Sequence, residues 1–116
     1  MNILLVDNEP VIRTTLKEMV TVWASGRHTI YEAGGVTEGL NMIEQLQPDI
    51  LLLDVEMDDG TGFDLLRQLH APRFQLIFTT AHNQYAIQAI KFSAIDYLLK
   101  PVHPEELYTA LQKAAG

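Results

Sequence analysis

Several polar residues in this chain could bind a metal ion or a phosphoryl group, and each follows a short apolar run. They are Asp7, Asp54, Thr79, Thr80 and Lys100. Short apolar runs are typical of the buried strands of a parallel sheet, and open α/β sheets bind ligands just beyond the carboxyl ends of such strands. We therefore expect these side chains to converge at one edge of a sheet.

Oxygen-bearing side chains follow two of the runs. Asp7, Asn8 and Glu9 come after the first run, and Asp54 comes after the run at residues 50–53. A cluster of oxygen ligands suits a hard cation, and Mg²⁺ is typically held by one or two carboxylates together with water and phosphate oxygens. The pattern predicts a Mg²⁺ site in which the cation relieves the repulsion between Asp7 and Asp54.

Asp54 is also a candidate nucleophile. A carboxylate can attack phosphorus and form an aspartyl phosphate. The charge on a phosphoryl group in transfer must be balanced by positioned cations and donors, which Mg²⁺, the Lys100 ammonium and the Thr80 hydroxyl could supply. These residues together predict phosphoryl transfer to Asp54.

The elements that must position these residues alternate between strand and helix patterns. After each expected strand, apolar residues recur at the three- and four-residue spacing of an amphipathic helix. Thr61 and Asp64 have the spacing of a capping box, and Pro104 suits the first turn of the last helix. Strands are expected at residues 3–6, about 28–33, 50–53, 75–78 and 96–99. The third helix is expected to run to Leu69, and the fourth, around residues 86–90, to be short and weakly packed.

Composition limits the classes of function. A chain of 116 residues that is 47% hydrophobic is expected to form one domain, residues 1–116. A formal net charge of -7 argues against binding nucleic acid or an anionic membrane, because phosphate contacts need clustered Lys and Arg. The absence of cysteine excludes disulfides and thiolate chemistry. No apolar run has the length of a membrane span or signal peptide, so we expect a cytoplasmic protein.

Taken together, the motifs resemble those of a receiver domain of a bacterial two-component response regulator, over essentially the whole chain. The resemblance rests on the acidic cluster after the first strand, Asp54 with the glycine-containing loop behind it, Thr80-Ala81, Tyr97 and Lys100-Pro101. It implies an α/β fold: a (βα)5 flavodoxin-like, doubly wound sheet of five parallel strands in the order 2-1-3-4-5, with helices on both faces. Residues 56–57, 59–63, 80–86 and 94–101 further resemble regulators of the LytTR-type subfamily.

The resemblance implies a role for each site residue. Asp54 would be the phospho-acceptor, Asp7 and Asn8 the metal-side pair, Glu56 a metal ligand through its backbone carbonyl, Thr80 and Lys100 the phosphoryl-sensing residues, and Tyr97 the switch aromatic. Asp54 would also bind the metal, and the Lys100-Pro101 peptide bond would be cis.

The same resemblance implies partners. A sensor histidine kinase would donate the phosphoryl group. If the parent protein is longer, a C-terminal output domain, expected to bind DNA, would receive the signal; these 116 residues include no such domain. Movement of Thr80 would open space for Tyr97 and change a surface that commonly forms a homodimer. The candidate interface residues are Ile87, Ile90, Lys91, Tyr97, Glu106 and Tyr108.

Two residues depart from the family pattern. Asn8 stands where receivers usually have a second acid, so one negative charge is missing and Mg²⁺ binding is expected to be weaker. Asp58 stands where the family usually has a proline, which predicts a looser loop, and its carboxylate could return a charge to the metal.

Each residue also has a purely structural interpretation. Alone, Asp54 could cap a loop, Thr80 could be an ordinary strand-end hydroxyl, Lys100 could end a strand at a turn, Asn8 could form a turn, and Tyr97 could be a half-buried strand aromatic. Only their combination favours chemistry. The four histidines, at positions 28, 70, 82 and 103, share no ligand spacing and are expected at the surface.

Three other functions compete with the phosphorylation switch. A pseudo-receiver that binds partners without phosphorylation is supported by Asn8 and opposed by the intact Asp54, Thr80 and Lys100. A small phosphatase with Asp7 as nucleophile fits the sequence at residues 7–11 poorly. A flavodoxin-like FMN binder would need a Ser/Thr/Gly phosphate loop after the first strand, and that loop is missing. We expect a regulatory domain that catalyses at most its own phosphorylation and dephosphorylation.

Overall fold

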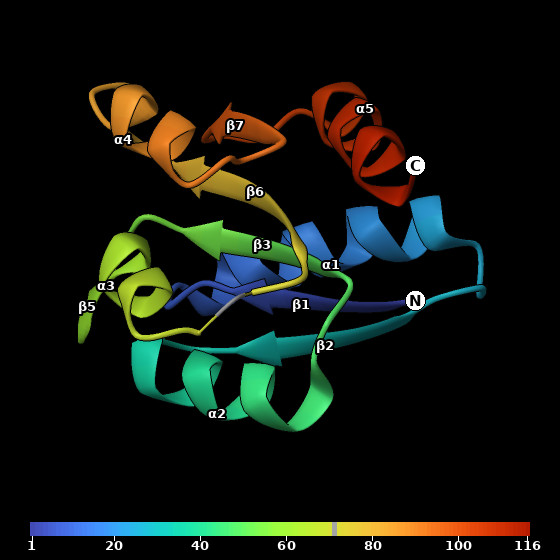
Figure 1. Cartoon of the computed structure of the whole chain (residues 1–116). Helices are drawn as coiled ribbons and strands as arrows, with labels where there is room; N and C mark the ends of the chain where they lie inside the picture. The colour runs from blue at the N-terminus through green and yellow to red at the C-terminus, as the bar shows by residue number, and fades with distance from the viewer. Residues whose placement is uncertain (71) are drawn as a thin grey trace.

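Five parallel strands form the central sheet, in the order β2-β1-β3-β6-β7. A computed structural model describes residues 1–70 and 72–116 (Figure 1). Its elements are β1 (Asn2–Val6), α1 (Pro10–Ala24), β2 (Thr29–Ala33), α2 (Val36–Leu46), β3 (Ile50–Asp54), β4 (Glu56–Met57), β5 (Gly60–Thr61), α3 (Gly62–Arg67), β6 (Gln75–Thr80), α4 (Ala86–Lys91), β7 (Asp96–Leu99) and α5 (Pro104–Ala115). Strands β4 and β5 form a separate small sheet, so β6 and β7 are the fourth and fifth strands of the central sheet. The expected fold and the expected order 2-1-3-4-5 are therefore confirmed.

Each face of the sheet is covered by its own group of helices. Alternate residues of a strand point to opposite faces, so Leu4 and Val6 pack with α2, α3 and α4, whereas Ile3 and Leu5 pack with α1 and α5. The strands are therefore buried on both sides. This double burial explains why they are continuous apolar runs rather than alternating patterns.

The carboxyl ends of all five strands lie at one edge of the sheet. In Figure 1 the strand arrows point towards the side of the molecule that carries α3, and both chain termini lie on the other side. The polar residues at the carboxyl ends of β1, β3, β6 and β7 consequently lie at the α3 side. The sheet thus gathers residues that are far apart in sequence.

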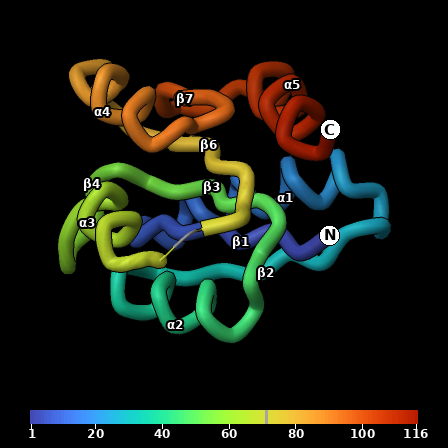
Figure 2. Tube along the Cα trace, viewed as in Figure 1, coloured from blue at the N-terminus to red at the C-terminus, as the bar shows by residue number. Residues whose placement is uncertain are grey.

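The connection from β3 to α3 is more ordered than expected. Strands β4 and β5 pair as a short antiparallel hairpin next to α3, where we had expected a loop (Figure 2). The capping box is confirmed, because Thr61 Oγ1 accepts from the Asp64 N–H and the Asp64 carboxylate accepts from the Thr61 N–H. The helix ends at Arg67 rather than Leu69, since Gln68 and Leu69 donate to carbonyls only three residues back.

Helix α4 is short, as predicted, and only loosely attached to the core. Ala89 is its one buried residue, whereas Ile87 and Ile90 are 72% and 74% exposed. Ile87 and Ile90 are three residues apart, so these two exposed apolar side chains are neighbours on one face of α4. None of the helices in the described residues is long and apolar enough to cross a membrane.

Candidate functional site

Three charged side chains meet at the carboxyl edge of the sheet. Lys100 Nζ lies 2.9 Å from Asp7 Oδ2 and 3.2 Å from Asp54 Oδ2. Asp7 follows β1, Asp54 ends β3 and Lys100 follows β7. Because these strands run parallel, the three residues lie at the same edge of the sheet. Both aspartates are almost completely buried, at 1% and 2% exposure. Two buried carboxylates thus share one ammonium group.

The inner oxygens of these carboxylates have unused bonding capacity. Among the residues that the structure describes, no donor has hydrogen-bonding geometry towards Asp7 Oδ2 or Asp54 Oδ2, although the Lys100 ammonium is close to both. The other Asp7 oxygen accepts the backbone N–H of Glu9 at 2.8 Å. A buried acceptor without a donor is costly, so these two oxygens are suited to bind a ligand.

A divalent cation fits this donor set. Asp7, Glu9 and Asp54 each offer a carboxylate oxygen, and the three oxygens lie within 4.8 Å of one another. An all-oxygen cluster of this charge is the type of site that Mg²⁺ binds. Glu9 was expected at this edge of the sheet as part of the oxygen cluster, but it was not assigned a role as a metal ligand.

The charge of Asp54 depends on its surroundings. Burial raises the pKa of Asp54 from 3.8 to about 6, an effect that Asp7 increases and Lys100 opposes. Burial would lower the pKa of Lys100, but the two aspartates more than compensate and raise it above its ordinary value. At neutral pH the site therefore holds a lysine cation and an ionised Asp54 carboxylate.

Thr80 and Tyr97 approach each other through a common neighbour, His82. Thr80 is fully buried, and its hydroxyl accepts the N–H of His82 at 3.2 Å. The Tyr97 hydroxyl donates to the carbonyl oxygen of His82. Burial raises the pKa of Tyr97, so its hydroxyl keeps its proton. The Lys100–Pro101 bond is cis, as the family resemblance implied.

An exposed side-chain contact lies where β4 meets the loop after β6. His82 Nε2 is 2.8 Å from Glu56 Oε1, and both side chains are about half exposed. His82 lies at the surface as predicted, but its pairing with Glu56 could not be inferred from sequence. Asp58 is exposed and does not belong to the cluster of acids that the structure brings together within the described residues.

The site residues are those expected of a response regulator receiver domain, and comparison with known protein families agrees. Residues 3–112 match the family of response regulator receiver domains. The chain belongs to this family.

Relatives of this receiver domain are regulators of about twice its length. It is 40% identical to the positive alginate biosynthesis regulatory protein of Pseudomonas aeruginosa, over 99% of the chain and 47% of that protein. It is 36% identical to the sensory transduction protein LytT of Enterococcus faecalis, over 99% of the chain and 48% of that protein. These relatives agree with the expected LytTR-type subfamily. The chain spans about half the length of the curated relatives it matches.

Solved receiver structures have the same fold. A response regulator receiver domain protein from Clostridium thermocellum superposes with a TM-score of 0.86 at 29% identity, covering 97% of this chain and 92% of that one. The response regulator TrrA of Thermotoga maritima, solved in complex with Mg²⁺-BeF, superposes with a TM-score of 0.84 at 28% identity, covering 97% of each chain.

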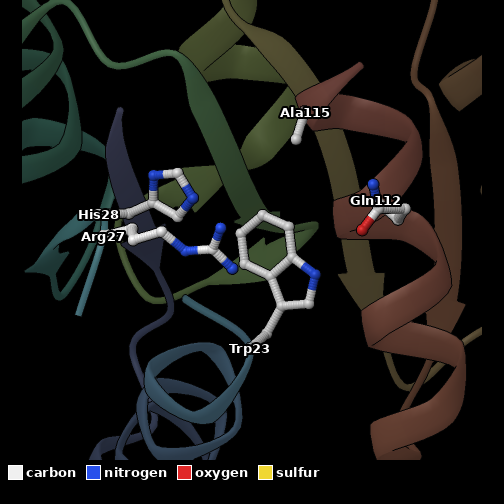
Figure 3. Close-up of a pocket in the computed structure, with 5 residues that line it drawn as sticks. All are labelled: Trp23, Arg27, His28, Gln112 and Ala115. Carbon is white, nitrogen blue, oxygen red and sulfur yellow. The ribbon is translucent and has the colours of Figure 1, made fainter. Parts of the chain in front are cut away.

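The receiver domain also has a hollow at the opposite end of the strands, between α1 and α5. Its lining residues are Trp23, Arg27, His28, Gln112 and Ala115 (Figure 3). The rings of Trp23 and His28 stack at 5.2 Å, and the buried Nδ1 of His28 has no hydrogen-bond partner among the described residues. His28 is thus only partly exposed, because the Trp23 ring stacks on it. Asp7, Asp54 and Lys100 are not among the residues that line this hollow.

Proposed function

We propose that this receiver domain is a phosphorylation-dependent switch in which Asp54 accepts a phosphoryl group from a sensor histidine kinase. One observation carries the proposal. Asp54 is a buried carboxylate at the end of the central strand β3, with an inner oxygen that lacks a hydrogen-bond donor among the described residues and lies 3.2 Å from a lysine ammonium. This oxygen is available as a nucleophile, and Lys100 can neutralise the charge that arrives.

In the transfer, an Asp54 oxygen forms a bond to phosphorus while the bond from phosphorus to the donor nitrogen breaks, and the electron pair leaves with that nitrogen. When bound, Mg²⁺ would neutralise charge on the phosphoryl oxygens, held by Asp7 and Asp54 with oxygen donors from Asn8, Glu9 and the Glu56 carbonyl. Lys100 contacts both buried aspartates, so its ammonium can move towards the phosphoryl group once Asp54 is modified.

The signal would leave the site through Thr80. A phosphoryl group on Asp54 would draw the Thr80 hydroxyl towards it and away from the His82 N–H, which it now accepts. The carbonyl of His82 also accepts from Tyr97, so movement of the loop after β6 reaches that ring directly. The two alternative arrangements form a two-state element biased by local charge.

The surface that would respond consists of α4, β7 and α5. Ile87, Ile90, Lys91 and Glu106 are exposed there, whereas Tyr97 and Tyr108 are partly buried. Exposed isoleucines beside charged residues suit a homodimer contact or a contact with an output domain. We propose that a longer parent protein, comparable in length to the relatives, carries a DNA-binding output domain that this surface controls.

Incubation with acetyl phosphate and Mg²⁺, followed by intact-mass measurement, tests the proposal. We expect the mass of one added phosphoryl group in the wild type and none in Asp54→Asn. A wild type that stays unmodified would make the domain a pseudo-receiver. Sustained hydrolysis of acetyl phosphate that only Asp7→Asn abolishes would make it a phosphatase.

A further inference from the structure

The hairpin that follows the acceptor is tied to a helix from an earlier part of the chain. Asp59, in the turn between β4 and β5, accepts the N–H of Val36 at 2.8 Å and the N–H of Thr37 at 3.1 Å. These two amides begin α2, whose amino end lies on the same side of the molecule as the hairpin (Figures 1 and 2). The two hydrogen bonds lower the pKa of Asp59, so it is ionised at neutral pH. A carboxylate at a helix amino end is favoured by both the free amides and the helix dipole.

The residue before α2 leaves room for this contact. Gly35 occupies the N-cap position and has no side chain that could cap the helix, so Asp59 supplies the cap from outside. A Cβ placed on Gly35 would lie 2.8 Å from Asp59 Oδ1, which is too close. The helix and the hairpin therefore approach each other closely because residue 35 is a glycine.

The other end of the hairpin is joined to the acceptor itself. The backbone N–H of Glu56, the first residue of β4, is close enough to the Asp54 carboxylate to lower its pKa. After β5, the N–H of Gly62 donates to the Val55 carbonyl at 2.8 Å, and a Cβ on Gly62 would lie 2.6 Å from the backbone oxygen of Asp54. The hairpin thus has little freedom at its base, and Asp59 fixes its tip.

We propose that Asp59 is a positioning residue for the phospho-acceptor site. By holding the hairpin tip on α2, it keeps the Glu56 backbone in place, with its N–H beside the Asp54 carboxylate and its carbonyl available to a metal. Asp59 touches no reacting atom and acts only through Glu56. The inference rests on the proposed function, since it concerns Mg²⁺ binding and phosphorylation at Asp54.

Asp58 provides a matched control for the test. It is the adjacent acid, it is exposed, and within the described residues it makes no hydrogen bond or ion pair. Asp59→Ala and Asp58→Ala remove the same charge from neighbouring positions, so a difference between them reports the contact with α2. Asp59→Asn keeps an acceptor oxygen without the charge and should restore part of the effect.

The experiment measures four quantities in each variant: Mg²⁺ affinity by calorimetry, the rate of phosphorylation by acetyl phosphate, thermal stability, and hydrogen exchange of the Glu56 amide by NMR. For Asp59→Ala we expect Mg²⁺ affinity to fall about tenfold, as is typical when a residue that orients a metal ligand is lost. Exchange at Glu56 should become faster, and phosphorylation should recover at high Mg²⁺. Asp58→Ala should match the wild type.

Gly35→Ala should disrupt the same contact from α2, because the added Cβ would lie too close to the Asp59 carboxylate. It provides a second, independent test if Asp59→Ala fails to fold. It should reproduce the loss in Mg²⁺ affinity, and combining it with Asp59→Ala should add little, since both remove one interaction. If Asp59→Ala differed from Asp58→Ala only in a lower thermal stability, with the same Mg²⁺ affinity and the same Glu56 exchange, Asp59 would be only a helix cap. That result would overturn the inference. A wild type that binds no Mg²⁺ and accepts no phosphoryl group would refute the proposed function, and the inference with it.

Discussion

Replacing Asp54 by asparagine should make the domain more stable, and by an amount that depends on pH. The folded state raises the pKa of this carboxyl from 3.8 to about 6, mainly through burial. The folded domain therefore binds the proton more tightly than the unfolded chain does. Below pH 3.8, ionisation of Asp54 does not affect the free energy of unfolding. As the pH rises from 3.8 towards 6 it lowers this free energy by an increasing amount, and above pH 6 the loss stays constant.

The size of this effect follows from the difference between the two pKa values. About two pH units correspond to about 3 kcal/mol at neutral pH, with roughly half of it present at pH 5. Asparagine has nearly the same shape and cannot ionise, so it removes this cost. The assay is urea unfolding of wild type and Asp54→Asn, followed by circular dichroism from pH 4 to pH 8 without Mg²⁺. The exposed Asp58→Asn serves as a control and should change little.

Two results would refute this reasoning. A gain for Asp54→Asn that is the same at every pH would show that ionisation is not its cause. A loss of stability at pH 7 would show that the contact between the carboxylate and Lys100, at 3.2 Å, outweighs the cost of burial.

Three further predictions concern the same pocket. Asn8→Asp should tighten Mg²⁺ binding about tenfold, or about 1.4 kcal/mol, because it adds a negative charge at the site; calorimetry that gives equal affinities would refute this. Lys100→Met should cost about 3–5 kcal/mol at pH 7 in urea unfolding and less at pH 4, since it leaves Asp7 and Asp54 buried without a counter-charge; a stability equal to wild type would contradict it. Thr80→Ala should still be phosphorylated but should lose the response of the tyrosine ring, detectable as an NMR shift change on phosphorylation; an unchanged response would separate the hydroxyl from the switch.

Residue patterns were sufficient to predict the sheet and most of the pocket. Strands covered on both faces must be apolar at every position, so β1 and β3 are visible as runs, and the polar residue that ends each run must lie at the edge. The convergence of Asp7, Asp54 and Lys100 follows from parallel pairing alone. The capping box at Thr61 is likewise local, since its two partners are three residues apart.

Contacts that depend on the path of a loop could not be predicted. Asp59 caps a helix whose first residues lie 22 and 23 positions earlier, and nothing in the sequence around it indicates that partner. The pairing of Glu56 with His82 joins β4 to a loop that only the finished sheet brings close to it. His28 is only partly exposed because the Trp23 ring stacks on it.

A crystal structure of the domain with Mg²⁺ and beryllofluoride, a mimic of the phosphoryl group, tests the central claim most directly. The account predicts beryllofluoride attached to the Asp54 carboxylate, Mg²⁺ held between Asp7 and Asp54, and the Lys100 ammonium in contact with the fluoride. A group bound to another residue, or a pocket that holds neither ligand at saturating concentrations, would contradict it.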